Sequence, residues 1–168
     1  VSPRLAAALP ALRTALARRQ APAVEVDWLE DLEGERALAG WRGAGAAPRG
    51  PVEGVAGWHP LSEEGALRRG GWGKQEVVMQ LPIPLRVPLG AFFQGNRHLV
   101  PRLFARVSEI ARALRPAAVV DVYGGVGLLA AAARDGGVER LAVVEAHRGA
   151  ASAAAQNLPG AAVHAVDA

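Results

Sequence analysis

Three glycines within four positions follow a short apolar run that ends in Tyr123. The stretch reads Asp121-Val122-Tyr123-Gly124-Gly125-Val126-Gly127, and an alanine-rich segment typical of a helix comes next. Glycine adopts positive φ without a steric penalty and lets a ligand approach the main chain closely. The helix would direct unpaired N–H groups and a partial positive charge at whatever lies over the turn. These residues therefore predict a strand–turn–helix unit that can hold a ligand.

Acidic residues end the next two predicted strands. Glu145 comes 18 residues after Gly127, and Asp167 follows the run Ala161–Val166. Nucleotide-binding α/β units place a carboxylate on ribose hydroxyls at about this spacing, and open parallel sheets bind ligands at the carboxyl ends of their strands. Asp121, before the turn, suits a group that receives a cation or orders the loop. Gly-Gly-x-Gly is not the full dinucleotide fingerprint, so a tight turn without a ligand is the alternative; the two acids favour a nucleotide.

Elements that must position these residues alternate in type. Short apolar runs predict strands, and alanine-rich segments between them predict helices. The strands are Ala117–Val122, Arg140–Glu145 and Ala161–Val166, and the helices are Leu128–Arg134 and His147–Asn157. This order predicts an α/β fold with three parallel strands in the order 3-2-1, a partial Rossmann-like sheet.

A different organisation is expected before residue 90. Ser2–Arg19 predicts a helix capped by Ser2, with an apolar stripe of leucines and with Pro10 as a kink or a break; the stripe is Leu5, Leu9, Leu12 and Leu16. Glycine, proline and short apolar runs then predict a small, mainly antiparallel sheet packed by this helix. Its candidate strands are Val24–Trp28, Gly50–Val55, Gly65–Trp72, Glu76–Leu81 and Ile83–Val87. We expect two domains, a small α+β domain at 1–90 and the α/β domain at 91–168.

All four tryptophans fall in this first domain, at positions 28, 41, 58 and 72. An aromatic-bearing sheet in a basic chain could stack bases. We favour half-buried tryptophans that pack against the helix. His59 is expected to be a surface loop residue.

Composition limits the class of protein. The 168 residues are 51% hydrophobic, carry a net charge of +3 and include one lysine and no cysteine. The basic balance permits an acidic partner such as RNA. Without cysteine, the chain has no disulfide, no thiolate metal site and no thiol nucleophile. No apolar run reaches the roughly 20 residues that span a membrane, and no signal peptide is apparent, so a cytoplasmic protein is expected.

Gln94 stands between a Phe-Phe pair and a helix start, where no structural propensity explains it. A ligand next to Gln94 would explain a polar residue at this position. Asn96 is expected to cap the helix Arg97–Leu114, which would place Leu99, Leu103, Ile110 and Leu114 on one face, with Val100, Phe104 and Val107 beside them.

The motifs Ala91-Phe92-Phe93-Gln94-Gly95-Asn96, then Asp121–Gly127, then Val143-Val144-Glu145, then an alanine-rich helix that ends in Gln156-Asn157 resemble those of the RNA uracil-carbon-5 methyltransferases, which are class I S-adenosylmethionine-dependent enzymes. The resemblance is clear from Leu85 to Asp167. It implies a class I methyltransferase sheet, S-adenosylmethionine as cofactor and tRNA or rRNA as partner. No metal and no membrane are implied.

The resemblance also implies roles for single residues. Gln94 would hold the amino-acid end of the cofactor. Tyr123 and the glycines Gly124, Gly125 and Gly127 would line its methionine side, with Asp121 beside them. Glu145 would accept hydrogen bonds from the ribose hydroxyls, since a carboxylate is an acceptor-only group. Asp167 would meet the adenine.

Three departures from the family are visible. Gly124 stands where a cysteine is usual, and Leu128 stands where asparagine or threonine is frequent. The family's cysteine nucleophile, which adds to carbon 6 of uracil, and its glutamate base are missing, so we expect a fragment with no catalytic residue that is inactive alone. Two other functions stay open: a methyltransferase for another substrate, and a non-catalytic relative that binds RNA or a protein.

Overall fold

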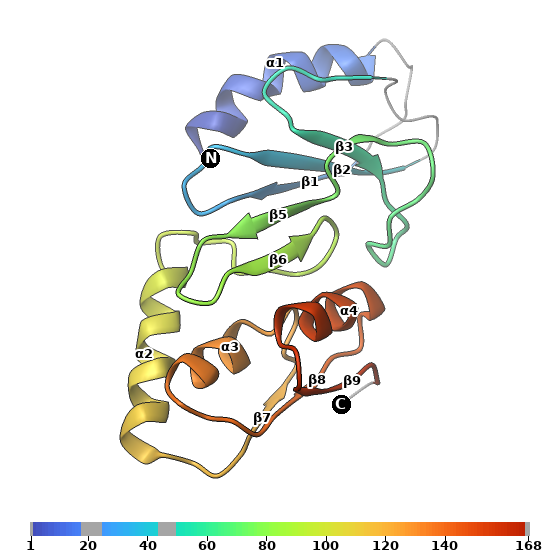
Figure 1. Ribbon diagram of the computed structural model, residues 1–168. Coiled ribbons are helices and arrows are strands. Elements are labelled where there is room, and N and C mark those ends of the chain that lie inside the picture. Colours follow the sequence, from blue (N-terminus) through green and yellow to red (C-terminus); the bar gives the residue numbers. More distant parts are fainter. Residues whose placement is uncertain (1, 18–24, 44–49, 167–168) are drawn as a thin grey trace. The chain divides into compact units, whose positions relative to one another are not determined.

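The computed structural model describes residues 2–17, 25–43 and 50–166. The chain forms two compact units, Val1–Val77 and Val78–Ala168. The order of their elements can be followed in Figure 1. The domain boundary expected from the sequence lies at residue 90. Within the described ranges, no helix combines the length and the apolar character needed to cross a membrane.

The first unit begins with the helix α1 (Pro3–Ala17), which packs on a sheet. As predicted, Ser2 caps it: the Ser2 hydroxyl oxygen accepts a hydrogen bond from the Leu5 N–H at 3.0 Å. The helix continues through Pro10 without being split. Leu5 and Leu12 face the core with Ala8, but Leu9 is exposed, so the predicted leucine stripe is only partly correct.

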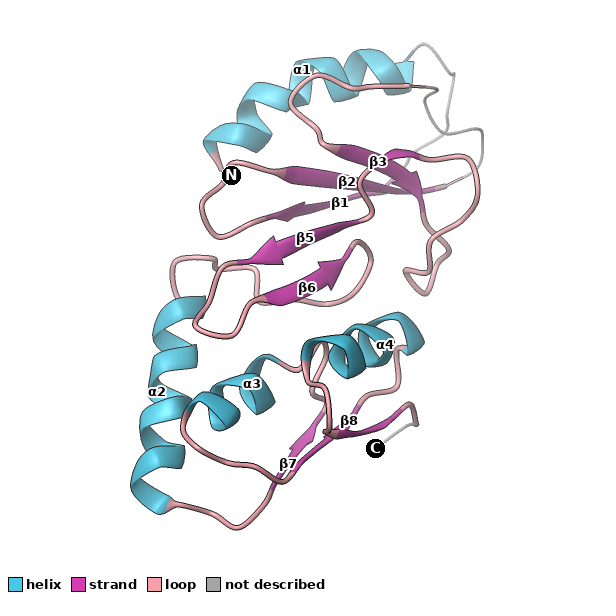
Figure 2. Cartoon of the chain, in the orientation of Figure 1, coloured by secondary structure: helices cyan, strands magenta, loops and turns pink. Residues whose placement is uncertain are grey.

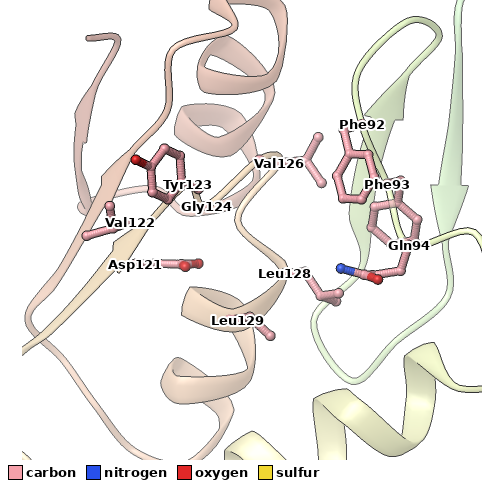
Figure 3. Close-up of a pocket in the computed structure, with 11 residues that line it drawn as sticks. Phe92, Phe93, Gln94, Asp121, Val122, Tyr123, Gly124, Val126, Leu128 and Leu129 are labelled. Carbon is pink, nitrogen blue, oxygen red and sulfur yellow. The ribbon is translucent and has the colours of Figure 1, made fainter. Parts of the chain in front are cut away.

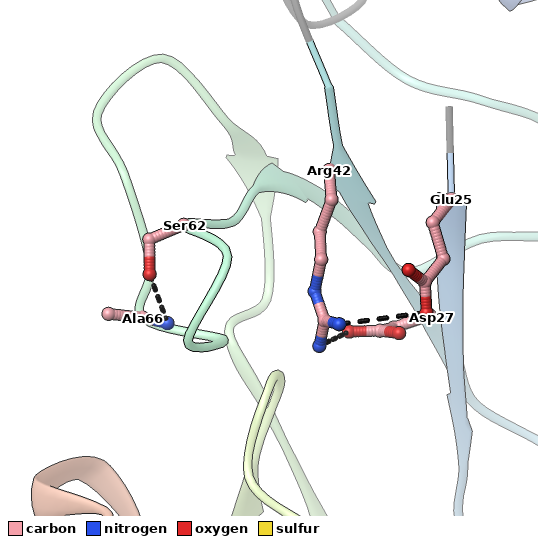
Figure 4. Close-up of polar contacts among 5 residues, drawn as sticks. All are labelled: Glu25, Asp27, Arg42, Ser62 and Ala66. Carbon is pink, nitrogen blue, oxygen red and sulfur yellow. Dashed lines mark hydrogen bonds and ion pairs between the residues drawn. The ribbon is translucent and has the colours of Figure 1, made fainter. Parts of the chain in front are cut away.

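The sheet of the first unit has the strand order β1-β2-β3-β4. Its strands are β1 (Glu25–Glu30), β2 (Ala37–Arg42), β3 (Gly57–Pro60) and β4 (Trp72–Gly73). The β1–β2 and β3–β4 pairs are antiparallel and the β2–β3 pair is parallel. An ion pair of 2.7 Å between Arg42 and Asp27 joins β1 to β2 (Figure 4).

Two predicted strands of this unit are wrong. Residues 50–55 form a loop whose Val52 and Val55 enter the core, and residues 65–72 are irregular except for a single bridge and the start of β4. The strand β2 was not predicted, because five of its six residues are buried and no alternation of polar and apolar residues marks it. The strand β3 was not predicted either, because Gly-Trp-His-Pro has low strand propensity.

Three of the four tryptophans confirm the packing interpretation, and the fourth, Trp72, does not, because it is 37% exposed. Trp41 and Trp58 are buried in the core cluster, and Trp28 packs against it. The prediction for His59 is wrong, because its side chain is only 3% exposed. Its Nε2 lies 2.8 Å from the Lys74 carbonyl oxygen, which ties β3 to the segment after β4.

In the second unit, three parallel strands confirm the predicted sheet order. β7 (Val119–Val122), β8 (Leu141–Val144) and β9 (Ala162–His164) pair in that order. Between them run α3 (Leu128–Asp135) and α4 (Arg148–Asn157), which pack on the sheet (Figure 2). Before them, β5 (Glu76–Met79), which crosses the unit boundary, and β6 (Leu85–Pro88) form a two-stranded sheet.

The helix α2 (Val100–Leu114) buries Val100 and Phe104, which were expected beside the main apolar face, and not that face itself. Its buried residues are Val100, Phe104, Ser108 and Ala111, and α2 packs on α3. The predicted face, Leu99, Leu103, Ile110 and Leu114, is exposed, with Leu114 at 73%. Both stripes repeat with helical spacing and contain large apolar side chains, so periodicity alone could not choose between them.

Asn96 caps a turn rather than the helix itself. Its Oδ1 accepts hydrogen bonds from the main-chain N–H groups of His98 and Leu99, at 3.1 and 3.3 Å. The helix then begins at Val100.

Candidate functional site

The glycine turn connects β7 to α3 and is fixed by its own main chain. The Gly124 N–H donates to the Val144 carbonyl at 3.1 Å, which ties the turn to β8, and the Gly127 N–H donates to the Gly124 carbonyl at 2.8 Å. Tyr123, Gly125 and Gly127 have left-handed φ values of 59°, 57° and 89°. Tyr123 is a non-glycine residue in this region, which is a sparsely populated and strained conformation typical of functional sites.

Two of the glycines are required by close packing. A Cβ on Gly127 would lie 2.7 Å from Leu158 Cδ1, and one on Gly124 would lie 2.6 Å from Val143 Cγ1 and 3.0 Å from Asp121 Cγ. A cysteine at position 124 would therefore displace Val143 or Asp121. The glycine at this position matches the packing that surrounds it.

Asp121 orders the turn and the helix after it. Its side chain is 8% exposed, and its Oδ2 accepts a hydrogen bond of 3.1 Å from the Ala130 N–H in the first turn of α3. Burial raises the pKa of Asp121, the Ala130 N–H opposes this, and repulsion from Glu145 raises the pKa further. The sequence suggested that Asp121 either receives a cation or orders the loop. Its hydrogen bond to the Ala130 N–H supports the second role.

Glu145 connects the end of β8 to the glycine turn. Its Oε2 accepts a hydrogen bond from the Gly125 N–H at 2.8 Å, and its Oε1 accepts one from the His147 N–H at 2.7 Å. His147 in turn caps α4, where its Nδ1 accepts from the Ala150 N–H at 3.2 Å. The acid that the spacing singled out therefore does meet the turn.

A cavity of about 100 Å³ lies over the turn (Figure 3). In Figure 3 the Gln94 amide is directed toward Leu128, from the opposite side of the cavity. The cavity is smaller than the roughly 300–1,000 Å³ typical of ligand pockets, so it can hold only part of a nucleotide-sized ligand. Its lining residues are Phe92, Phe93, Gln94, Asp121, Val122, Tyr123, Gly124, Gly125, Val126, Leu128 and Leu129.

Of the predicted site residues, the structure brings five together in the cavity wall: Gln94, Asp121, Tyr123, Gly124 and Gly125. Gly127 begins α3 beside them, and Glu145 reaches the wall through its hydrogen bond to Gly125. Asp167 lies outside the described residues. Leu128 is buried and gives the wall an apolar side chain where the resembling family often has a polar one.

Asn157 was not predicted to belong to the site. It is the last residue of α4, and its side chain hydrogen bonds to Arg86 in β6 and to Val126 in the glycine turn. One signal was available in the sequence: Gln156 and Asn157 are polar residues at the end of an otherwise alanine-rich helix.

Metal binding has no geometric support in the part of the chain that the structure describes. No group of three histidine or acidic side chains there could hold an ion.

No protein-family model matches the chain, and no curated protein matches it. Several solved structures are similar to the chain. The Pyrococcus abyssi tRNA (uracil-54, C5)-methyltransferase in complex with S-adenosyl-L-homocysteine is 16% identical with a TM-score of 0.71, over 89% of this chain and 42% of that one. A SAM-dependent methyltransferase from Agrobacterium tumefaciens is 14% identical with a TM-score of 0.51, over 88% and 54%. The aTrm5 protein in its complex with tRNALeu is 12% identical with a TM-score of 0.50, over 92% of this chain and 50% of that one.

The chain has a Rossmann-like methyltransferase fold. At identities of 12–16%, the comparisons establish the fold alone. The chain spans about half the length of these proteins.

Proposed function

We propose that the chain binds S-adenosylmethionine and is the cofactor-binding part of a methyltransferase that modifies RNA, with carbon 5 of uracil in tRNA or rRNA as its target. The observation that carries the proposal is the 2.8 Å hydrogen bond between Glu145 and Gly125. It joins the acid at the end of one parallel strand to the glycine turn at the end of its neighbour, which is the edge where open α/β sheets bind ligands.

The residues at this edge fit the cofactor. Among the described residues, a Cβ on Gly125 would have one neighbour within 4 Å, the Phe92 carbonyl oxygen at 3.7 Å, so the turn leaves space above it. Each Glu145 oxygen accepts one main-chain N–H and retains a second lone pair, which suits a ribose hydroxyl. The Gln94 amide both donates and accepts, as the amino-acid end of the cofactor requires.

In this proposal Glu145 holds the ribose, Tyr123 and the glycines line the methionine side, Gln94 binds the amino-acid end, and Asp167 meets the adenine. Asp121 keeps the turn in place through α3. The bound cofactor supplies a methyl group on a sulfonium centre. The residues of this chain bind and orient it.

The choice of RNA as substrate is supported by the Phe-Phe-Gln-Gly-Asn motif and by the fold match to a tRNA (uracil-54, C5)-methyltransferase. Carbon 5 of uracil becomes nucleophilic only after a thiolate adds to carbon 6. The chain has no cysteine, so the 168 residues alone should transfer no methyl group to uridine. A tritiated-methyl transfer assay on uridine-containing RNA checks this, and transfer by the chain alone would contradict it.

Calorimetry with S-adenosylhomocysteine tests cofactor binding. Glu145→Ala removes hydrogen bonds to a charged group that contribute roughly 1.5–3 kcal/mol, so the affinity should fall by roughly 10- to 150-fold. Glu139→Ala is the control, because Glu139 is an exposed acid. Wild-type protein that binds no S-adenosylhomocysteine would refute the proposal, and equal affinities for the two variants would remove Glu145 from the site.

A second candidate function is a non-catalytic relative that binds RNA or a protein. The apolar Leu128 in the cavity wall favours it. Full-length protein that binds S-adenosylhomocysteine but methylates no RNA would support this function over the first.

A further inference from the structure

Asn157 makes three hydrogen bonds to main-chain atoms outside its own helix. Its side chain is only 8% exposed. Its Oδ1 accepts from the Arg86 N–H at 2.9 Å, and its Nδ2 donates to the Arg86 carbonyl at 3.0 Å and to the Val126 carbonyl at 2.9 Å. Asn157 therefore pairs with Arg86 as a neighbouring strand would, and its second amide hydrogen reaches the glycine turn.

The two segments that Asn157 joins carry opposite sides of the cavity. From Arg86, β6 runs through a turn, in which the Ala91 N–H donates to the Pro88 carbonyl at 3.2 Å, into Phe92 and Gln94. Val126 belongs to the glycine turn and lines the other side. Both partners of Asn157 are thus close in sequence to residues that line the cavity: Arg86 precedes Phe92 and Gln94 by a few residues, and Val126 lines the cavity itself.

Apolar packing around Asn157 does not replace these bonds. Leu158 and Ala154 of the same region approach Gly127, which fixes the distance between α4 and the turn. Such contacts have no direction, whereas hydrogen bonds fix the angle and the register of the groups they join. Loss of the Asn157 amide would remove all three bonds, and the Val126 carbonyl would lose its partner in a buried setting, which costs enough to drive a local shift of the glycine turn.

We propose that Asn157 is a positioning residue that holds the segment carrying Gln94 against the glycine turn and so sets the shape of the cofactor pocket without touching the ligand. This inference rests on the proposed binding of S-adenosylmethionine. It assigns to the end of α4 a role that extends beyond helix packing.

The test compares Asn157→Ala with Ser108→Ala. Ser108 is equally well buried, and its hydroxyl donates to Asp135 at 2.5 Å, but it joins α2 to α3 and does not line this cavity. Both variants should be less stable than the wild type. Under conditions where both are fully folded, only Asn157→Ala should weaken S-adenosylhomocysteine binding, by roughly 5- to 100-fold.

Asn157→Asp supplies a second readout. Aspartate keeps the acceptor for the Arg86 N–H but places a carboxylate against the carbonyls of Arg86 and Val126. Its affinity for S-adenosylhomocysteine should rise as the pH falls and the new carboxyl group gains a proton to donate, and the ratio of its affinity to that of the wild type should follow this titration. A ratio that does not change with pH would argue against positioning through these bonds.

Equal dissociation constants for folded Asn157→Ala and wild-type protein would overturn the inference. If the wild type binds no S-adenosylhomocysteine, the proposed function fails, and hydrogen exchange of the unliganded protein decides the positioning role. Faster exchange of the Gly125 and Gly127 amides in Asn157→Ala than in Ser108→Ala would support it, and equal rates would overturn it.

Discussion

The two compact units are stabilised in different ways. In the first unit, large aromatic side chains fill the space between α1 and the sheet, with Trp41 and Trp58 fully buried. In the second unit, α3 buries four consecutive small residues, Ala130–Ala133. It packs closely on α2, where a Cβ on Gly136 would lie 2.6 Å from the Ala111 Cβ. The cohesion of the first unit therefore depends on a few large side chains, and that of the second depends on close backbone approach.

Their buried polar groups differ as well. The indole nitrogens of Trp41 and Trp58 are buried and have no hydrogen-bond partner among the described residues. In the second unit, the buried side chains of Asp121, Asn157 and Ser108 are all hydrogen bonded, and the first two lead to the glycine turn. The first unit also has buried side chains with hydrogen-bond partners, since Asp31 accepts from the Glu35 N–H and His59 contacts the Lys74 carbonyl, but neither of these bonds reaches the glycine turn.

The largest expected effect is in the first unit. Trp58→Ala should lower its free energy of unfolding by about 3–5 kcal/mol, because the substitution leaves a cavity in the core. Affinity for S-adenosylhomocysteine should not change. Hydrogen exchange of the β2 and β3 amides measures the first effect, and calorimetry at a temperature where the protein is folded measures the second.

The matched control is Trp72→Ala, because Trp72 is the partner of Trp58 in the β3–β4 pair but is exposed. We expect it to cost less than about 1 kcal/mol. Similar losses for the two substitutions would contradict the view that a few buried aromatic residues stabilise the first unit.

Gly127→Ala should have the next largest effect and should act in the second unit. The left-handed φ costs an alanine about 1–2 kcal/mol, and the Cβ would overlap Leu158, which adds about 1–3 kcal/mol. Gly137→Ala measures the cost of the left-handed φ alone, since Gly137 has a φ of 97° and a Cβ on it would meet no described atom within 4 Å. Urea unfolding of both variants checks the difference, and equal costs would show that close approach to α4 is unimportant.

Asp121→Asn should have a smaller effect that depends on pH. The pKa of Asp121 is raised in the folded state, so the folded protein binds this proton more tightly than the unfolded chain does. Its contribution to stability is therefore present at low pH and is lost as the pH rises through the raised pKa. Asparagine can still accept the Ala130 N–H but does not titrate.

Urea unfolding across the acidic range tests this prediction. The free energy of unfolding of the wild type minus that of Asp121→Asn should decrease as the pH rises. A difference that increases with pH would show that the ionised carboxylate is the form that the fold favours.

The smallest effect is expected on the exposed face of α2. Leu114→Gln should change the free energy of unfolding by less than about 0.5 kcal/mol, because Leu114 is 73% exposed. Ser108→Ala, on the buried face of the same helix, should cost about 1.5–3 kcal/mol, because it removes the hydrogen bond from the Ser108 hydroxyl to the Asp135 carboxylate. Thermal unfolding of the two variants compares the faces, and a large loss for Leu114→Gln would restore the face first expected from the sequence.

The sequence predicted the α/β part well because its signals are local. Short apolar runs, the glycine turn after Asp121 and an acid at Glu145 each specify a strand end or a turn, and the parallel order follows from their alternation. The mainly antiparallel sheet was less predictable. β2 is buried almost throughout, β3 contains glycine and proline, and both are defined by pairing with distant strands.

At the site, residue types could be predicted but their contacts could not. The spacing singled out Glu145, yet nothing local shows that its carboxylate accepts the Gly125 N–H. Asn157 lies 71 residues from Arg86, so their pairing exists only in the folded chain. Asn96 accepts the main-chain N–H groups expected of a cap, but it does so in a turn before α2. The prediction for the buried face of α2 was wrong because α2 packs on α3 through the stripe that contains Val100 and Phe104.

Tyr123 has a consequence for how this turn could evolve. Its main chain has a φ of 59° and its side chain is 74% exposed. A glycine or asparagine would adopt this conformation more easily, so selection for stability alone would not maintain a tyrosine there. The strained main chain lowers stability, and interactions or a function of the tyrosine must balance this cost. In a laboratory selection for heat resistance without a demand for activity, position 123 should therefore be among the first in this unit to drift toward glycine or asparagine.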